Sequence, residues 1–397
     1  MKTSRLQEDF PLIGRFNYLN THGIGLTPKP VMEEVHSLLD QGIDSPPFEP
    51  IYHFYLKTVE EARILFSQLI RCRAEELSLQ PSSSAGLNLV AEMVKLRPGD
   101  NIVTDDLNFP SAVWPWRTPA MMKAGVKVKV VRNRSGRVDL EDFEKVIDTK
   151  TKIVTTSLVS FVNGFRTDAE GLGKLAASKG SYFLLDATLG CGYEDIDVKK
   201  WGVDFFVTSN YKWLMGQFGS AEFYCRKELM DQLESPHAGY FSHEEPPYPR
   251  SRGKRPLENR LLTFRRARTS RQFEIGNQDY LSLFFLLKSL EYARRVGYSE
   301  IRKRAYRLRD LMIEGLEGAG AEIHSPVDQA NRSLEIFFGV RGMSTRDLYT
   351  VLKKKGIWAG TSAWDLSDQS GVRASVHFYN LEQDVEALTK AVAGIKK

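Results

Sequence analysis

Two residues of opposite charge, Lys212 and Asp186, form the most informative pattern in the sequence. Asp186 ends the apolar run SYFLLD, and Lys212 closely follows the next apolar run, DFFVTS. A lysine in a desolvated pocket has a lowered pKa, so that its neutral amine can form a Schiff base with an aldehyde. A carboxylate facing it can pair with a protonated pyridine nitrogen and keep that ring an electron sink. The pair predicts a site for pyridoxal 5'-phosphate, although a strand-end aspartate and a surface lysine are each common separately.

The composition is that of a globular protein. The chain has 397 residues, of which 42% are hydrophobic and 26% charged, and this length favours one large domain with a smaller one. The net charge of +5 is mild and does not argue for a nucleic-acid partner. No run approaches the roughly 18 apolar residues of a membrane span, and the N-terminus lacks the apolar core of a signal peptide. We therefore expect neither a membrane nor a nucleic-acid partner.

The three cysteines, Cys72, Cys191 and Cys225, have neither CxxC spacing nor paired histidines. We expect no disulfide framework and no metal site, and a reducing, cytoplasmic location fits this pattern.

Strand and helix patterns alternate from about Ser78 to Cys225. This rhythm predicts an α/β fold in which helices cover a large, mostly parallel sheet. Ligands of such sheets lie at the carboxyl ends of the strands, where Asp186 and Ser209 fall. After Cys225 a long, basic loop over 236–271 is expected to border the active-site mouth, and two long helices, short strands and a final helix follow. We predict a large cofactor-binding domain over 21–295 and a smaller α+β domain built from 1–20 and 296–397.

Seven motifs occur in the order typical of the class V aminotransferase family, which the sequence resembles over nearly its whole length. They are SSSAGLN, NFPSAVWPW, SFVNGFRTD, DATLG, SNYKW, RQFEIGN and VRASVHFYN. This family of fold-type I pyridoxal-phosphate enzymes contains cysteine desulfurases, isopenicillin N epimerase and kynureninase. The resemblance implies the PLP-dependent transferase fold, with a seven-stranded sheet in the large domain and pyridoxal 5'-phosphate as the cofactor.

The resemblance also implies which residues hold the cofactor phosphate. Ser83, Ser84 and Ala85 begin a helix whose free N–H groups and dipole suit an anion; simple N-capping is the alternative. Ser209 and Tyr211 flank the lysine and offer two further hydroxyl groups.

Phe109 matches the family residue that stacks on the pyridine ring, although it can also be read as a core aromatic. Asn277 takes the place of a threonine that reaches the cofactor phosphate of the neighbouring subunit. If it does so here, the enzyme is a homodimer with a shared active site. Asn277 as the N-cap of the following helix is a compatible alternative.

Arg373 matches the family arginine whose planar guanidinium binds a substrate α-carboxylate. His22 lies in an N-terminal turn that approaches the substrate in relatives, but a loop histidine is usually solvated. Trp358 and Trp364 flank the loop that precedes Arg373. They are expected either to shape a partly apolar substrate pocket or simply to pack inside the protein. Asn163 completes the set of expected substrate-binding residues.

Two polar partners of the cofactor's ring hydroxyl are replaced by apolar residues. Leu189 stands where the family often has glutamine, and Phe161 stands where it often has asparagine. Thr188 and Asn163 are the candidate substitutes, and the change indicates a specialised member of the family.

The sequence also lacks the nucleophilic cysteine of the desulfurases. That residue lies on a loop before the carboxylate-binding arginine, and here the loop reads AGTSAWDLSDQSG. This disfavours an enzyme that forms a persulfide on its own cysteine.

These residues predict a pyridoxal-phosphate enzyme that acts on an amino-acid-like substrate. The substrate amine displaces Lys212 to give an external aldimine, Lys212 moves the Cα proton as a general base, and Asp186 stabilises the carbanion through the pyridinium. We favour C–S lyase or related β-elimination chemistry. An aminotransferase or an epimerase is the alternative, and a non-catalytic, ligand-binding descendant of the fold is the alternative of another class.

Overall fold

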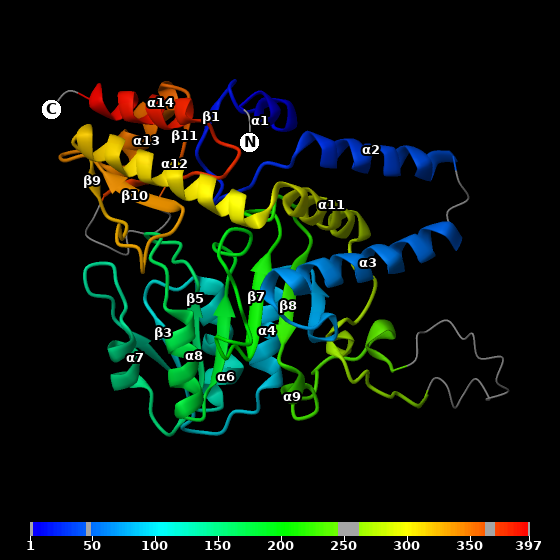
Figure 1. The fold of residues 1–397 in the computed structure, drawn as a ribbon. Helices are drawn as coiled ribbons and strands as arrows, with labels where there is room; N and C mark the ends of the chain where they lie inside the picture. The colour runs from blue at the N-terminus through cyan, green and yellow to red at the C-terminus, as the bar shows by residue number, and fades with distance from the viewer. Residues whose placement is uncertain (1–2, 45–48, 245–261, 362–369, 396–397) are drawn as a thin grey trace.

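A seven-stranded sheet forms the centre of the larger part of the molecule (Figure 1). The computed structural model describes residues 3–44, 49–244, 262–361 and 370–395. The strand order is β2-β8-β7-β6-β5-β3-β4; only β8 runs antiparallel to its neighbours. This confirms the predicted α/β fold and its mostly parallel, seven-stranded sheet. The strands are β2 (Leu77–Gln80), β3 (Asn101–Asp105), β4 (Lys127–Val131), β5 (Thr151–Ser157), β6 (Tyr182–Asp186), β7 (Phe205–Ser209) and β8 (Ala221–Cys225).

The central strands are apolar along their length because both faces of the sheet are covered. Phe183 and Leu185 of β6 belong to one hydrophobic core, while Leu184 between them belongs to the other. Side chains of a strand alternate between the two faces, so continuous burial requires an apolar residue at nearly every position. The neighbouring strand β7 is likewise buried throughout.

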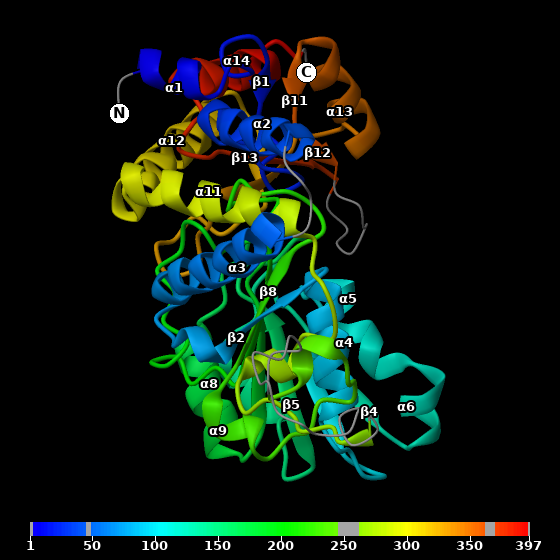
Figure 2. The ribbon, with the colours of Figure 1, turned by 90° about the vertical axis from the view of Figure 1, so that its right-hand side faces the viewer.

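Helices from different parts of the chain cover the two faces, as Figure 2 shows. One face packs against α3 (Glu49–Ile70), α7 (Leu140–Val146), α8 (Ala169–Ser178) and α11 (Tyr280–Val296). The other packs against α4 (Ser83–Met93), α5 (Pro110–Val113), the 3-10 helix η2 (Trp114–Arg117), α6 (Pro119–Lys123) and α9 (Lys227–Met230). Prolines divide the run from α5 to α6, since Pro115 lies in η2 and Pro119 begins α6. Three further 3-10 helices are η1 (Ala74–Glu76), η3 (Tyr240–Ser242) and η4 (Ser270–Phe273).

The C-terminal residues build a smaller α+β unit above the large sheet (Figure 1). Its antiparallel sheet has the order β12-β13-β10-β9. These strands are β9 (Glu322–Ile323), β10 (Glu335–Gly339), β12 (Gly360–Thr361) and β13 (Val372–Ser375). Three helices share a hydrophobic core with the sheet: α12 (Tyr298–Gly318), α13 (Thr345–Lys354) and α14 (Glu382–Ala393).

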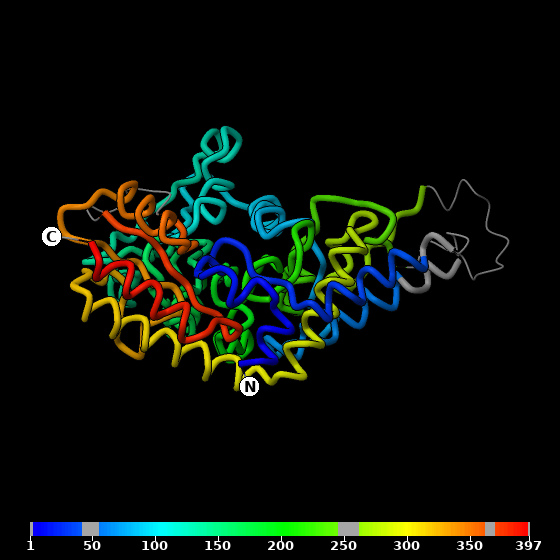
Figure 3. Tube along the Cα trace, turned by 90° about the horizontal axis from the view of Figure 1, so that it is seen from above, coloured from blue at the N-terminus to red at the C-terminus, as the bar shows by residue number. Residues whose placement is uncertain are grey.

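The N-terminal segment packs on this smaller unit. It contains α1 (Thr3–Asp9) and β1 (Asn17–Tyr18), which pairs in parallel with β11 (Ile357–Trp358). Next, α2 (Lys29–Asp44) runs alongside α11 and α3 to one side of the molecule (Figure 3). The predicted boundary near 295 falls in the last turn of α11, just before α12, and the division into two domains stays a prediction. Among the residues that the structure describes, none of the helices has the length and apolar character that a bilayer crossing requires.

A turn near the N-terminus is fixed directly against the chain at Lys212. The backbone N–H of Gly25 donates to the carbonyl of Tyr211 at 2.8 Å. A Cβ atom on Gly25 would lie 1.8 Å from the carbonyl oxygen of Lys212, so only glycine allows this approach. The N-terminal turn therefore covers the backbone that carries the lysine.

We predict that Gly173→Ala destabilises the fold, because a Cβ atom there would lie 1.8 Å from the carbonyl oxygen of Trp201. Such overpacking costs about 2 kcal/mol and should lower Tm by several degrees in thermal denaturation followed by circular dichroism. Gly318→Ala is the matched control, since Gly318 is also helical and has no atom within 4 Å of the added Cβ among the described residues. Equal melting temperatures for the two variants would contradict this packing.

Candidate active site

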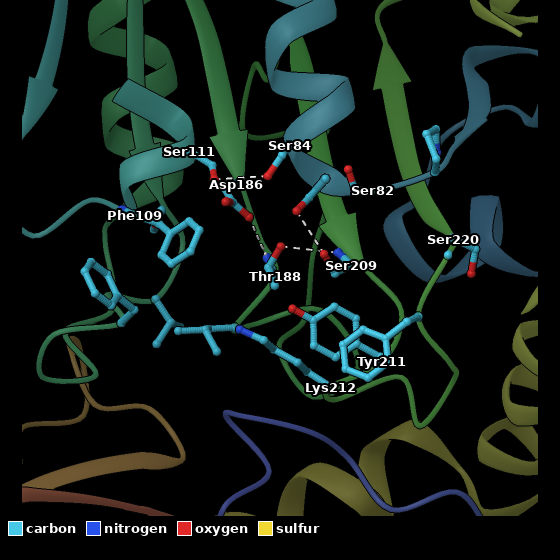
Figure 4. Close-up of a pocket in the computed structure, with 18 residues that line it drawn as sticks. Ser82, Ser84, Phe109, Ser111, Asp186, Thr188, Ser209, Tyr211, Lys212 and Ser220 are labelled. Atoms are coloured by element: carbon cyan, nitrogen blue, oxygen red, sulfur yellow. Dashed lines mark hydrogen bonds between the residues drawn. The ribbon is translucent and has the colours of Figure 1, made fainter. Parts of the chain in front are cut away.

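Lys212 and Asp186 project into one cavity at the carboxyl ends of the parallel strands (Figure 4). The cavity has a volume of about 320 Å³, which is within the range of small-molecule sites. Its walls come from the ends of β5, β6 and β7, the start of α4 and the turn before α5. The lining residues are Pro81, Ser82, Ser83, Ser84, Phe109, Ser111, Ser157, Val159, Phe161, Asp186, Thr188, Leu189, Ser209, Tyr211, Lys212, Phe218, Gly219 and Ser220.

Burial makes the amine of Lys212 a usable nucleophile. Burial lowers its pKa to about 8, with a smaller lowering by Arg373, while the negative charges of Asp186 and Glu335 act in the opposite direction. A substantial fraction of the amine is therefore neutral near physiological pH, as attack on an aldehyde requires.

The turn after Lys212 is held in a conformation that side chains rarely adopt. Met215 has a positive φ of 59°, and its carbonyl accepts hydrogen bonds from Thr27 at 3.1 Å and Ser289 at 3.0 Å. Such backbone strain persists only where the surroundings hold it. Two distant segments of the chain thus fix the loop that presents the lysine.

The carboxylate of Asp186 is buried but anchored. Burial raises its pKa, whereas a hydrogen bond from Thr188 and the charge of Lys212 lower it. The backbone N–H of Thr188 donates to Oδ1 at 2.9 Å. This contact fixes the orientation of a carboxylate whose strongest nearby positive group is Lys212.

Hydroxyl groups gather where α4 begins. Ser82 is the N-cap, and its side chain accepts a hydrogen bond from the N–H of Ala85 at 3.1 Å. Ser83 and Ser84 line the cavity, and Ser209 donates to Ser83 at 2.9 Å. The helix start thus offers an anion site. Of the three phosphate-binding residues predicted at the start of this helix, Ser83 and Ser84 line the cavity, whereas Ala85 does not and its N–H is already bonded to Ser82. Ser82 lines the cavity although it was not predicted.

Phe109 presents an aromatic face to the cavity, and the neighbouring residues hold it there. Asn108 accepts a hydrogen bond from the N–H of Phe109 at 2.8 Å. The ring of Phe161 packs edge-on against Phe109 with centroids 5.2 Å apart. Phe161 and Leu189, the two apolar replacements, both line the cavity. Thr188 also lines it, with its hydroxyl accepting from the N–H of Ser209 at 3.2 Å.

Tyr211 and Phe218 form a second aromatic wall. Their rings stack with centroids 4.2 Å apart, and Nζ of Lys212 lies 5.7 Å from the centroid of Tyr211.

Arg373 and His22 lie together near Lys212, although they come from opposite ends of the chain. His22 is 3% exposed, so it is buried, whereas a histidine in a loop is usually solvated. Its Nδ1 lies 2.9 Å from the hydroxyl of Ser375. Burial, with Arg373 and Lys212, lowers its pKa well below the usual value, and the ring is therefore neutral.

Three other predicted residues lie away from the cavity lining or outside the described residues. Asn163 uses its side chain to link two backbone segments, donating to the carbonyl of Gly136 at 2.8 Å and accepting from the N–H of Phe165 at 3.0 Å. Asn277 is exposed, and Asp279 rather than Asn277 caps α11. Trp364 lies outside the residues that the structure describes.

Several lining residues were not predicted. They are Ser82, Ser111, Ser157, Phe218 and Ser220, together with the wall formed by Pro81 and Val159. Two of them carried a signal in the sequence. Ser157 ends the strand TKIVTTS, and Ser111 follows Phe109 in NFPS, so each places a hydroxyl close to a predicted site residue. A further missed residue is Glu335, whose signal is a charge inside the apolar run SLEIFFGV.

None of the three cysteines lines the cavity. Cys191 and Cys225 are buried and Cys72 is partly buried; burial raises the pKa of each thiol. The thiolate that acts as a nucleophile is therefore disfavoured at all three positions. Within the described ranges no cluster of three or more metal-ligating side chains occurs.

Known proteins resemble the chain over its whole length. It is 27% identical to a probable cysteine desulfurase of Pyrococcus abyssi (strain GE5 / Orsay), across 96% of this chain and 94% of the relative. The apo structure of cysteine desulfurase from Thermococcus onnurineus NA1 matches with a TM-score of 0.86 and 26% identity, over 98% of this chain and 96% of that one.

A more distant structure is the cystine C–S lyase C-DES in complex with its reaction product cysteine persulfide. It has a TM-score of 0.84 and 17% identity over 97% of this chain and 99% of that one. At this identity the likeness shows the shared fold alone.

The family model described as aminotransferase class-V matches residues 18–388. These findings confirm the expected fold type, and class V aminotransferases use pyridoxal phosphate as their cofactor. A catalytic protein is therefore supported over a non-catalytic descendant of the fold. The chain belongs to the class V aminotransferase family of pyridoxal-phosphate enzymes.

Proposed function

We propose that this protein is a pyridoxal-phosphate-dependent C–S lyase that removes a sulfur-bearing group from the β-carbon of an amino-acid substrate. The observation that carries the proposal is the buried pair of Lys212 and Asp186 in one cavity that no cysteine of the chain lines. The 27% identity of the chain to a probable cysteine desulfurase also supports chemistry at a C–S bond of the substrate.

The residues of the cavity fit pyridoxal phosphate. A buried carboxylate suits its pyridine nitrogen, a desolvated amine suits its aldehyde, and a helix start with serine hydroxyls suits its phosphate. Phe109 offers a flat face to the ring. When bound, the cofactor stabilises negative charge on the carbon next to the substrate amine.

Lys212 and Arg373 have different roles in the proposed reaction. The amine of Lys212 would hold the cofactor at its aldehyde, and Nζ of Lys212 is the group that would take the proton from Cα of the substrate. Arg373 pairs with the substrate carboxylate and orients the molecule. Removal of the Cα proton and departure of the sulfur group from Cβ break one C–H and one C–S bond, and water completes the conversion to pyruvate and ammonia.

The cysteine content separates this reaction from that of a desulfurase. Transfer of the sulfur atom alone to a protein thiolate needs a reactive cysteine at the cavity. Because burial raises the pKa of all three thiols, we assign release of the sulfur group as a small molecule. Three free cysteines also support a cytoplasmic location.

We also propose a homodimer whose active sites are shared. Asn277 is exposed and is absent from the lining of its own chain's cavity. The adjoining segment borders that cavity, since Ser282 donates to the carbonyl of Phe218 at 2.5 Å. Asn277 is thus available to reach the phosphate bound by a second copy.

Cofactor capture should follow the ionisation of Lys212. We expect the rate at which apoprotein gains visible absorbance with pyridoxal phosphate to rise about tenfold for each pH unit below 8 and to level off above it, because only the neutral amine attacks. Lys212→Ala should give no absorbing covalent product, whereas the exposed Lys29→Ala should match the wild type. A midpoint near 10.5 would show an amine that is not desolvated.

The reaction should tolerate loss of every cysteine. We expect holoenzyme with cystine or S-alkyl cysteines to yield pyruvate and ammonia in equal amounts, because the chemistry is an elimination. The triple variant Cys72→Ala, Cys191→Ala, Cys225→Ala should keep at least about half of kcat, since no cysteine lines the cavity, while Lys212→Ala should lose about a thousandfold or more. Alanine in place of pyruvate when free cysteine is the substrate, with loss of activity in the triple variant, would identify a desulfurase instead.

Shared sites should allow two defective subunits to complement each other. Lys212→Ala removes the amine, and Asn277→Asp places a negative charge beside the partner's phosphate. In a mixed dimer one site contains both defects and the other contains neither, so mixing should restore about a quarter of wild-type activity. The check is activity after subunit exchange, with mass determination by light scattering. A monomer, or a mixture no more active than its parts, would contradict the shared site.

A further inference from the structure

Arg373 already has a carboxylate partner within its own chain. Its Nη1 lies 3.2 Å from Oε1 of Glu335, whose side chain is fully buried, while the side chain of Arg373 is 13% exposed. The guanidinium also donates to the carbonyls of Phe161 and, at 3.2 Å, Thr361. The cation expected to receive the substrate carboxylate is therefore paired inside the protein.

The small sheet fixes this arrangement. In the antiparallel pairing of β10 with β13, Glu335 lies opposite Ser375 and Phe337 lies opposite Arg373. The intervening residue Ile336 packs into the core of the smaller unit. Because side chains alternate along a strand, Glu335 and Arg373 share the other face, where Ser375 holds His22.

The charges around Glu335 come from three elements. Arg373 acts from β13 and Lys212 from the loop after β7, and both favour the ionised carboxylate. Tyr193 is near enough to be affected by Glu335, but burial keeps its phenol neutral by raising its pKa. His22 is neutral, as described above. Burial dominates over the two cations and raises the pKa of Glu335.

Three atoms of this group are buried and have no hydrogen-bond partner within the described residues: Oε2 of Glu335, Nε of Arg373 and Nε2 of His22. An ionised carboxylate with one bare oxygen is costly to bury, more so than the neutral acid. A substrate carboxylate at Arg373 would add a second buried anion beside Glu335. Like charges in such a site cannot both remain ionised, so one of the two groups takes up a proton.

We propose that Glu335 is a specificity-determining residue, because the substrate α-carboxylate pairs with Arg373 only when Glu335 carries a proton. Binding of a carboxylate therefore takes up one proton, and ionised Glu335 selects against carboxylate anions at Arg373. This inference rests on the proposed role of Arg373 as the clamp for the substrate carboxylate.

The test uses propanoate, a carboxylate without an amine, as a competitive inhibitor of the holoenzyme between pH 5.5 and 8.5. For the wild type we expect the inhibition constant to rise about tenfold for each pH unit once Glu335 ionises. Glu335→Gln should bind propanoate at least tenfold more tightly at pH 8 and should lose this dependence on pH. Calorimetry in buffers of different ionisation enthalpy should show one proton taken up per propanoate in the wild type and none in the variant.

Controls separate Glu335 from the other titrating groups. His22→Gln should keep the wild-type pH dependence, and the neutral isostere propanamide should show none with any variant. Any pH dependence that arises at Lys212 and the cofactor persists in Glu335→Gln, because that variant leaves both unchanged.

Two failures can be told apart. If Glu335→Gln binds propanoate with the affinity, pH dependence and proton uptake of the wild type, Glu335 has no such role. If Arg373→Gln binds propanoate as tightly as the wild type, the carboxylate clamp of the proposed function is itself wrong.

Discussion

The rest of the active site depends on keeping the amine of Lys212 out of water opposite the buried carboxylate of Asp186. Burial disfavours the charged forms of both groups, while their mutual attraction restores part of that charge. The balance leaves an amine that is partly neutral and a carboxylate that is still available to a cation. This balance requires that the strand ends position the two groups, that closely packed backbone excludes water from them, and that hydrogen bonds orient them. The positive φ at Met215 and the contact at Gly25 both serve to hold that geometry.

Much of the fold is readable from the sequence because buried parallel strands leave continuous apolar runs, and their carboxyl ends collect at one edge. Asp186, Ser209 and the lysine loop follow from that rule. The exact start of α4 does not, because Ser82, Ser83 and Ser84 are equivalent as letters and only the backbone selects Ser82 as the cap. Glu335 escaped prediction for another reason: cross-strand register sets its partner, and nothing local in SLEIFFGV reveals that register.

The two apolar replacements change the character of the cavity wall. Phe161 and Leu189 both line the cavity, and the ring of Phe161 packs edge-on against Phe109. Thr188 keeps a hydroxyl at the wall but bonds it to the backbone of Ser209. Pyridoxal phosphate bound as proposed would therefore be held mainly by contacts at the two ends and the face of its ring. An apolar wall of this kind favours substrates with carbon-rich or sulfur-rich side chains.

The contacts of the N-terminal turn bear on the order in which the protein matures. Asn20 forms a β-bridge with Ser375, and the backbone N–H of His22 donates to the hydroxyl of Ser375, which lies 353 positions later in the chain. Contacts of such separation close large loops and form slowly. A ribosome must therefore release nearly the entire polypeptide before the turn can seat against Lys212. Partial chains leave that surface uncovered in the meantime, and uncovered surface of this kind favours association between incomplete chains.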